Sequence, residues 1–400
     1  MFHLIPPAGT PISFRDIIQA VNLRLLKGNC SEQFENAVKN YTNAKYCYFF
    51  NSGRTALVFI LKALSKQTDD TRNEVVIPAY TCFSVPAAIA RSGLKIRLVD
   101  IDPMTMDYNY DKLSNINFTK VLAIVASNLF GIISDWQRLW SIARDKGIFL
   151  IDDAAQSMGS SYEGKPSGVL GDVGFYSLGR GKNMSTYSGG ILVTDNDKIA
   201  LYVENNMKVI NKPGLINETC VLLKIILYIL LLRPRLYWLP AMIPFLGLGE
   251  TVFDKDFDLK RLTYLQICAG AVLMDNLMKV NVARAKNAHK LAESLLKMSQ
   301  YMIPGYDKNK CPFYLRLPLL CSDKTDRDKV EISLKRQGIV ASTMYPSTIR
   351  QIPGVKKFLA SNDDCFPGAQ IVVDKLISLP THPYLTDDDI LKITSCLFKG

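Results

Sequence analysis

The stretch IFLIDDAAQ, residues 148–156, decides the fold class of this chain. Four apolar residues in succession are typical of a buried strand, and two carboxylates, Asp152 and Asp153, end the run. Ligands of open α/β sheets bind beyond the carboxyl ends of the strands, so both carboxylates are candidate site residues. The alternative, that one of them caps a following helix, stays open on this stretch alone.

Stretches typical of strands and of helices alternate around this run. Short apolar runs bounded by turns predict further strands at residues 74–80, 95–102 and 120–127. Apolar residues spaced by three and four predict helices at residues 31–44 and 53–66. Such alternation predicts an α/β fold in which helices flank both faces of a mostly parallel sheet.

The C-terminal part has a different pattern. A long helical stretch at residues 259–298 leads into two strand-like runs, at 312–321 and 375–380. Helix-like stretches at 326–338 and 386–398 accompany them, which predicts a smaller α+β domain.

These patterns divide the chain into four ranges. We expect an N-terminal arm (1–30), a large α/β domain (31–210) and an apolar insertion (211–255). A long linking helix with a small C-terminal α+β domain follows (256–400).

Composition limits the possible partners. Hydrophobic residues make up 48% of the 400 residues and charged residues 21%, which excludes a disordered chain. The formal net charge is +11, but lysine and arginine are scattered and form no compact stripe. We therefore expect no nucleic-acid partner, and favour an anionic small molecule or an anionic membrane surface.

Histidines and cysteines give no sign of a metal centre. The three histidines are widely separated, and Asp100, Asp102 and Asp107 fit a strand end and a loop, so no metal is assigned. The nine cysteines form no C-x-x-C pair and are odd in number, which predicts reduced thiols in a reducing compartment. The first residues lack the pattern of a secretory signal, so we expect a cytoplasmic protein.

Two further stretches carry candidate site residues. GFYSLGRGKN at 174–183 ends in Lys182-Asn183, and a lysine in a loop rich in serine and glycine can form a Schiff base. A loop lysine taken alone is more often a solvated charge. NSGRTAL at 51–57 is a turn that opens a helix, and backbone N–H groups at a helix start bind phosphate.

Together the three stretches describe a pocket for pyridoxal 5′-phosphate (PLP), which needs a lysine, a carboxylate and a phosphate cradle. The chain resembles the DegT/StrS-type sugar aminotransferases, a branch of the fold-type I PLP enzymes. The family pattern stands here as DDAAQ (152–156), GDVGFYS (171–177), Lys182-Asn183 and Gly189-Gly190. The matches IPAYTC (77–82), LVDIDPMTM (98–106), FPGAQ (366–370) and LPTHPYLT (379–386) extend the resemblance over nearly the whole chain outside 211–255.

The resemblance implies roles for individual residues. Lys182 would form the imine with the cofactor aldehyde and then carry a proton between substrate Cα and cofactor C4′. Asp153 would keep the pyridine nitrogen protonated, which makes the ring an electron sink. Gln156 would hydrogen-bond near the phenolic oxygen of the cofactor.

The resemblance also assigns the remaining cofactor-binding residues. Ser177 and the backbone of Gly53, Arg54 and Thr55 would hold the phosphate. Cys82 stands where many members stack an aromatic ring on the cofactor, so that role stays open.

The implied function is PLP-dependent transamination. An amino acid donor, glutamate or glutamine, would pass its amino group to a keto acceptor, a nucleotide- or lipid-linked keto sugar of cell-surface polysaccharide biosynthesis. Members with histidine in place of this lysine are dehydratases, so Lys182 favours transamination. The resemblance further implies a homodimer. Another PLP reaction on this scaffold, or a non-catalytic PLP-binding regulator, stays open as an alternative.

Residues 220–249 form an apolar segment interrupted by Arg233-Pro234-Arg235. Each apolar run is shorter than the roughly 20 residues that cross a bilayer, so no transmembrane span is expected. One interpretation is packing on protein. The other is a dock at the inner face of the membrane, because Tyr228, Tyr237 and Trp238 accompany the arginines.

Overall fold

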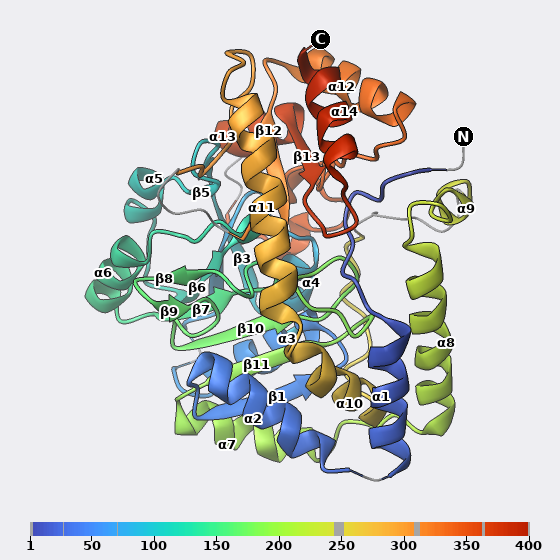
Figure 1. Ribbon diagram of the computed structural model, residues 1–400. Helices are drawn as coiled ribbons and strands as arrows, with labels where there is room; N and C mark the ends of the chain where they lie inside the picture. The colour runs from blue at the N-terminus through green and yellow to red at the C-terminus, as the bar shows by residue number, and fades with distance from the viewer. Residues whose placement is uncertain are drawn as a thin grey trace.

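The fold is known from a computed structural model that describes residues 3–26, 28–69, 71–243, 252–307, 313–361 and 365–398. One seven-stranded sheet has the order β1-β11-β10-β7-β6-β2-β3. Strand β11 is antiparallel to both neighbours, and the other neighbouring pairs are parallel. Helices lie on both sides of the sheet (Figure 1). The predicted α/β fold with a mostly parallel, helix-flanked sheet is confirmed.

The elements have the following bounds. The strands of the sheet are β1 (Tyr46–Phe50), β2 (Glu74–Pro78), β3 (Lys95–Val99), β6 (Val121–Ser127), β7 (Phe149–Asp153), β10 (Val173–Ser177) and β11 (Gly190–Thr194). The helices that precede the C-terminal part are α1 (Phe14–Leu25), α2 (Cys30–Thr42), α3 (Gly53–Ser65), α4 (Ser84–Arg91), α5 (Tyr110–Ser114), α6 (Trp136–Lys146), α7 (Asp197–Met207), α8 (Leu215–Leu231), α9 (Trp238–Ala241), α10 (Tyr264–Met274) and α11 (Leu277–Leu295). The C-terminal part contains β12 (Arg316–Leu320), α12 (Lys324–Arg336), α13 (Pro367–Lys375), β13 (Leu376–Pro380) and α14 (Asp387–Phe398). Two short ribbons, β4 (Ile101–Asp102) with β5 (Asp107–Tyr108) and β8 (Ser161–Tyr162) with β9 (Lys165–Pro166), complete the strands.

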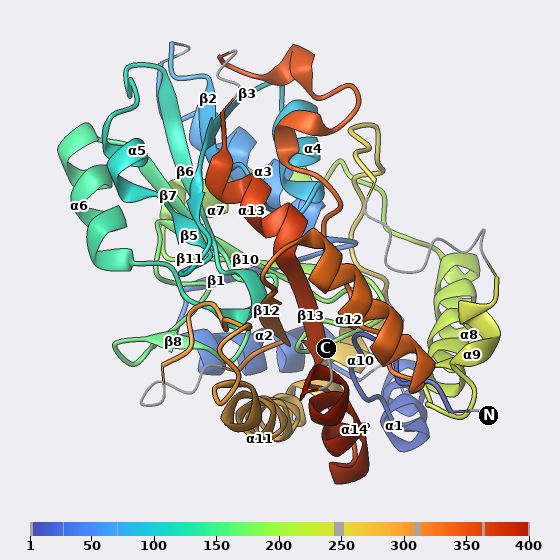
Figure 2. The same cartoon turned by 90° about the horizontal axis from the view of Figure 1, so that it is seen from above.

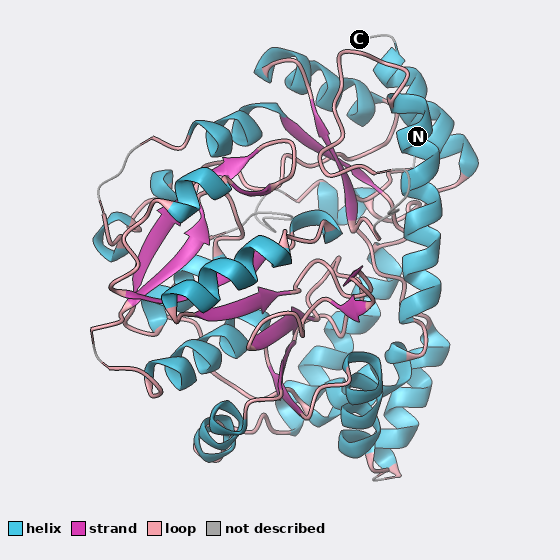
Figure 3. Ribbon diagram, turned by 90° about the vertical axis from the view of Figure 1, so that its left-hand side faces the viewer, coloured by secondary structure: helices cyan, strands magenta, loops and turns pink. Residues whose placement is uncertain are grey.

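The two faces of the sheet are buried in separate clusters. Successive strand residues point to opposite faces, so Ile151 and Val125 join the cluster beneath α3 and α4, while Leu150 and Ile124 join the one beneath α6. Figure 3 shows strands with helices on either side. Because both faces are covered, these strands carry continuous apolar runs rather than alternating polar residues.

The predicted long linking helix is wrong in one respect, because it is two helices. Helix α10 ends at Met274 and α11 begins at Leu277. The residues between them, Asp275 and Asn276, have short polar side chains that compete with helical backbone bonds. Figure 1 shows the two helices meeting at an angle, with α11 running on to the C-terminal part.

The C-terminal part is fastened to the sheet through Asp100, which follows β3. Its carboxylate accepts hydrogen bonds from the N–H groups of Gly368 (3.0 Å) and Ala369 (2.9 Å) at the start of α13. This carboxylate therefore caps a helix. Helices α12, α13 and α14 gather around the β12–β13 pair on this side of the molecule (Figure 2).

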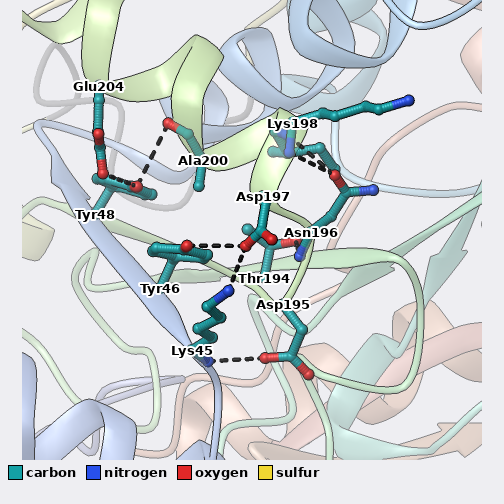
Figure 4. A network of polar contacts seen from close by, with 11 residues as sticks. Lys45, Tyr46, Tyr48, Thr194, Asp195, Asn196, Asp197, Lys198, Ala200 and Glu204 are labelled. Atoms are coloured by element: carbon teal, nitrogen blue, oxygen red, sulfur yellow. Dashed lines mark hydrogen bonds and ion pairs between the residues drawn. The ribbon is translucent and has the colours of Figure 1, made fainter.

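Strand β1 at the edge of the sheet is held from outside by α7. Tyr48 Oη donates to Glu204 (2.9 Å), and Lys45 Nζ and Tyr46 Oη both reach the carboxylate of Asp197 (Figure 4). Neither this strand nor β11 was among the strands predicted from the sequence.

Helix α8 carries apolar residues on two sides. Ile225, Ile229 and Leu232 are buried. Exposed apolar residues follow one another at helical spacing on the outer side, at Ile216 (82% exposed), Leu223 (56%) and Leu227 (54%). Figures 1 and 2 place α8 beside α1 at the edge of the molecule.

The predicted apolar segment at 220–249 is only partly described, because residues 244–249 lie outside the described residues. Within the described ranges, no helix is both long enough and apolar enough to cross a bilayer.

The prediction of reduced thiols is wrong for one pair of cysteines. Cys30, at the start of α2, and Cys268, in α10, form a disulfide. The two are separated by 238 positions, so their spacing gave no sign of the contact. The other described cysteines are free, and Cys311 lies outside the described residues.

His382 fastens the N-terminal arm to the C-terminal part. It is fully buried, and its Nε2 donates to the carbonyl oxygen of Pro6 (2.9 Å). Burial, aided by the charges of Arg284 and Arg316, lowers the pKa of His382 from 6.5 to about 4. The histidine is therefore neutral in the folded chain at neutral pH.

This burial predicts a pH-dependent stability. Between pH 6.5 and about 4 the unfolded chain binds a proton at His382 that the folded chain does not. The contribution of neutral His382 to the free energy of unfolding is therefore complete above pH 6.5. About 2 kcal/mol of this contribution should be lost by pH 5. Urea unfolding of wild type and His382→Gln across this range measures it. The same pH dependence in both proteins would contradict the prediction.

Candidate active site

A cavity of about 150 Å³ lies at the carboxyl edge of the parallel strands. Seven of the eight predicted site residues line it: Gly53, Arg54, Cys82, Asp153, Gln156, Ser177 and Lys182. They come from the start of α3, the ends of β7 and β10, and the loops after β2, β7 and β10. The three stretches singled out in the sequence therefore meet at one place.

The eighth residue, Thr55, does not line the cavity. Its N–H donates to Ser52 Oγ (3.2 Å) and its hydroxyl donates to Asn51 Oδ1 (2.7 Å). Thr55 thus completes the N-cap of α3, while Ser52 itself lines the cavity.

The two carboxylates that end β7 have different surroundings. Asp152 accepts hydrogen bonds from the N–H groups of Gly168 (2.6 Å) and Leu170 (3.1 Å) and from Asn128 Nδ2 (2.7 Å). Asp153 accepts from Ala155 N–H (3.0 Å) and lines the cavity. No helix follows β7 directly, so neither residue is a helix cap. Asp152 holds the loops together, and Asp153 is the carboxylate available to a ligand.

Both carboxylates are buried, which disfavours their charged forms. Burial raises the pKa of Asp153 to about 6, and the hydrogen bond from Ala155 and the charge of Lys182 oppose this rise. Burial raises the pKa of Asp152 to about 7, although its three hydrogen bonds oppose the rise. A cation in the cavity would favour the ionised form of Asp153.

Lys182 is positioned by the loop that follows β10. Its carbonyl oxygen accepts a hydrogen bond from the hydroxyl of Thr10 in the N-terminal arm, and Arg284 Nη2 lies 3.5 Å from the same oxygen. Loss of solvation lowers the pKa of Lys182, although the charge of Asp153 opposes the effect. A lowered pKa makes the neutral, nucleophilic amine more accessible at neutral pH.

The opening turn of α3 forms one end of the cavity. The first N–H groups of any helix have no intrahelical acceptor, so those of Gly53 and Arg54 are available to an anion. Strand β11 passes very close behind, because a Cβ on Gly190 would lie 2.4 Å from the backbone carbon of Ser52. A Cβ on Gly53 would lie 3.3 Å from that of Ser177. Glycine at these positions lets the turn approach Ser177 and form a cradle.

Gln156 and Cys82 line another part of the wall. Gln156 Oε1 accepts from Phe130 N–H (3.1 Å), and its Nε2 donates to Tyr345 Oη (3.0 Å). The ring of Phe83 stacks on Tyr345 at 6.0 Å, and Cys82 occupies the wall instead. The aromatic ring that many family members place at the position of Cys82 is therefore not supplied here by its neighbour Phe83.

Several lining residues were not predicted from the sequence. Thr81 and Ser84 follow β2, Asn128 follows β6, and Phe175 lies in β10. The positions after β2 and β6 could have been found, since parallel strands end at a common edge.

The residues present fit PLP. The cavity holds a partly desolvated lysine, a buried carboxylate and a helix start with its glycine cradle, which are the three groups that this cofactor needs. Among the described residues, no cluster of histidine, cysteine or carboxylate side chains is arranged to hold a metal ion.

Comparison with known proteins identifies the family. The pattern of the DegT/DnrJ/EryC1/StrS aminotransferase family matches residues 13–220 and 257–398. The chain therefore belongs to this family and is a PLP-dependent aminotransferase with the fold-type I architecture. The stretch between the two matched ranges, 221–256, includes most of α8 and all of α9.

Individual relatives share most of their length with the chain. It is 27% identical to UDP-2-acetamido-2-deoxy-3-oxo-D-glucuronate aminotransferase of Pseudomonas aeruginosa, over 91% of this chain and 89% of that protein. It is 25% identical to GDP-perosamine synthase of Caulobacter vibrioides, over 91% and 88%. The solved structure of Helicobacter pylori PseC, an aminotransferase of pseudoaminic acid biosynthesis, superposes with a TM-score of 0.81 at 16% identity, covering 99% of this chain and 98% of that one.

The different surroundings of the two carboxylates predict different mutant effects. Asp153→Asn keeps the acceptor for Ala155, so its unfolding free energy should stay within about 1 kcal/mol of wild type, while turnover falls at least ~100-fold. Asp152→Asn weakens three buried hydrogen bonds and should cost about 2–4 kcal/mol. Urea unfolding and single-turnover kinetics separate the two outcomes. Similar stability losses in both variants would refute the assignment.

Proposed function

We propose that this chain moves an amino group from an amino acid donor, glutamate or glutamine, to a keto sugar carried on a nucleotide or lipid in polysaccharide biosynthesis. The observation that carries the proposal is that Lys182 and Asp153 line one cavity with the N-terminus of α3. The named activities of the Pseudomonas and Caulobacter relatives support the sugar acceptor.

PLP, when bound, supplies an aldehyde that takes up amines and a ring that accepts electrons from the substrate Cα. We propose that Lys182 Nζ holds the cofactor and then moves the proton from Cα. The carboxylate of Asp153 pairs with the ring nitrogen and keeps it protonated, for which its buried position is suited.

The other cofactor contacts are proposed on the same basis. The N–H groups of Gly53 and Arg54 and the hydroxyl of Ser177 hold the phosphate, with Thr55 acting through the cap of α3. Gln156, which keeps one amide N–H beyond its bond to Tyr345, faces the phenolic oxygen. Cys82 contacts the ring from the wall of the cavity.

The assignment of Lys182 has a direct test. Borohydride reduction of the protein with PLP, followed by peptide mapping, should leave a pyridoxyl group on Lys182. Lys182→Ala should lose the label and at least ~1,000-fold in turnover, because the attachment point and the proton carrier are removed together. Lys198→Ala, at the exposed start of α7, is the matched control. It should keep the pyridoxyl label on Lys182 and wild-type turnover. A pyridoxyl group on another lysine would exclude the assignment.

We also propose that the protein acts as a homodimer with a shared site, which rests on the family resemblance. A peripheral contact with an anionic membrane surface is a further part of the proposal. It is supported by the exposed apolar residues of α8, Ile216, Leu223 and Leu227. Exposed Arg233 and Arg235 follow the helix, and the net charge of the chain is +11. Apolar side chains flanked by basic ones are typical of helices that lie in a membrane surface.

The membrane contact predicts co-sedimentation with vesicles of phosphatidylglycerol and phosphatidylcholine at low salt, and weaker binding to phosphatidylcholine alone. Leu223→Glu/Leu227→Glu should lose most of the binding, because two charges then enter the apolar side of α8. Leu201→Glu/Leu391→Glu changes two leucines exposed to a similar degree on other helices, and should bind as wild type does.

Two outcomes would overturn the membrane contact. One is wild-type protein that stays in the supernatant at low salt. The other is a Leu223→Glu/Leu227→Glu variant that keeps vesicle binding but changes its sedimentation coefficient, which would make α8 a contact between copies of the chain.

A further inference from the structure

Arg316, the first residue of β12, is a cation that finds no anionic partner in the described part of the chain. No ion pair joins it to a carboxylate among the described residues, and its Nε is buried with no hydrogen-bond partner there. Its Nη1 lies 3.1 Å from the sulfur of Met344, which is a weak acceptor. Burial lowers the pKa of Arg316, although nearby tyrosines oppose the effect. A guanidinium in such surroundings has strong unused capacity to bind an anion.

Arg284 is the informative contrast. Arg284 is fully buried and has no carboxylate partner among the described residues either, but its guanidinium donates to the carbonyl oxygens of Leu315 (2.9 Å) and Gly9 (2.6 Å). These contacts join α11 to β12 and the N-terminal arm, so Arg284 has a structural role. Arg316 is the neighbouring cation for which the described residues supply no such set of acceptors.

Arg316 is connected to the wall of the cavity. Its neighbour Met344 precedes Tyr345, and Tyr345 Oη accepts a hydrogen bond from Gln156, which lines the cavity. The charge of Arg316 also helps to lower the pKa of Lys182. The guanidinium therefore lies behind the lining residue Gln156, beyond Met344 and Tyr345, and within electrostatic range of Lys182.

Tyr237, between α8 and α9, also belongs to the surroundings of Arg316. Burial raises the pKa of Tyr237, and the charge of Arg316 opposes this rise. Tyr237 lies within the segment 221–256 that the family pattern does not match. A residue of the unmatched segment therefore lies within electrostatic range of Arg316.

We propose that Arg316 binds the α-carboxylate of the amino donor, and of the keto acid that the donor becomes, while the amino group faces Lys182. The inference rests on the proposed function, because an amino acid donor brings a carboxylate next to the amine that reacts. The phosphate cradle at α3 belongs to the cofactor, so the donor carboxylate needs a second cation. A guanidinium binds a carboxylate through two parallel hydrogen bonds, which also orients it.

Calorimetric titration of the PLP-loaded protein with 2-oxoglutarate tests the proposal. Arg316→Gln should weaken binding at least ~10-fold, and Arg316→Lys, which keeps the charge without the paired donors, several-fold. PLP absorbance should be unchanged in both. Arg336→Gln removes the same charge from an exposed position of α12 and should bind as wild type does.

Each result of the titration either supports or overturns the assignment of Arg316. Unchanged 2-oxoglutarate binding in Arg316→Gln would overturn it, and unchanged binding in Arg316→Lys would do so if the glutamine variant does not fold. Titration with UDP-glucuronate and UDP-glucose forms a second arm. A loss confined to UDP-glucuronate would show that Arg316 binds a carboxylate of the acceptor and would also overturn the assignment. Wild-type protein that takes up no PLP would refute the proposed function. The same titration with 2-oxoglutarate would then be made on the protein without PLP, where unchanged binding in Arg316→Gln would still overturn the assignment of Arg316.

Discussion

The hydrogen bonds to Asp152 are the interaction on which the arrangement of the site depends. One buried carboxylate gathers the loop after β6, through Asn128, and the loop before β10, through Gly168 and Leu170. Successive strand residues point to opposite faces, so fixing Asp152 on one face directs Asp153 to the other. The same backbone therefore supplies one carboxylate that holds the loops and one that lines the cavity. This explains why two aspartates in succession end β7, when the cofactor needs only one.

The lysine loop is fixed from behind by parts of the chain that are distant in sequence. Thr10 donates its hydroxyl to the carbonyl oxygen of Lys182, and its N–H donates to Tyr228 of α8 (3.2 Å). Arg284 joins the same loop to α11. Since neither contact uses the amine of Lys182, the loop can be rigid while the amine stays free to react, a condition for precise positioning of a reactive group.

Much of the fold and the residues expected to bind the cofactor could be predicted from the sequence. Strands β2, β6 and β7 were predictable because they are buried on both faces and are therefore continuous apolar runs. Strand β1 was missed because its side chains are partly exposed and its hydrogen-bonded partners, in β11 and α7, lie about 140 or more positions away. The disulfide was not predicted because Cys30 and Cys268 are 238 positions apart. Local patterns report burial and turns, but not which distant elements become neighbours.

The predictable and unpredictable parts of the site differ in how they are built. The cofactor side consists of backbone turns, glycines that allow close approach, and residues at strand ends, so it leaves a pattern in the sequence. Behind Gln156 lie Tyr345 and Arg316 of the C-terminal part, and Tyr237 of the unmatched segment is within electrostatic range of Arg316. These side chains need no fixed spacing along the sequence, because the segments that carry them can change in sequence without disturbing the sheet. The backbone cradle thus fixes the position of the cofactor, while those segments can change. A scaffold built in this way can serve different substrates.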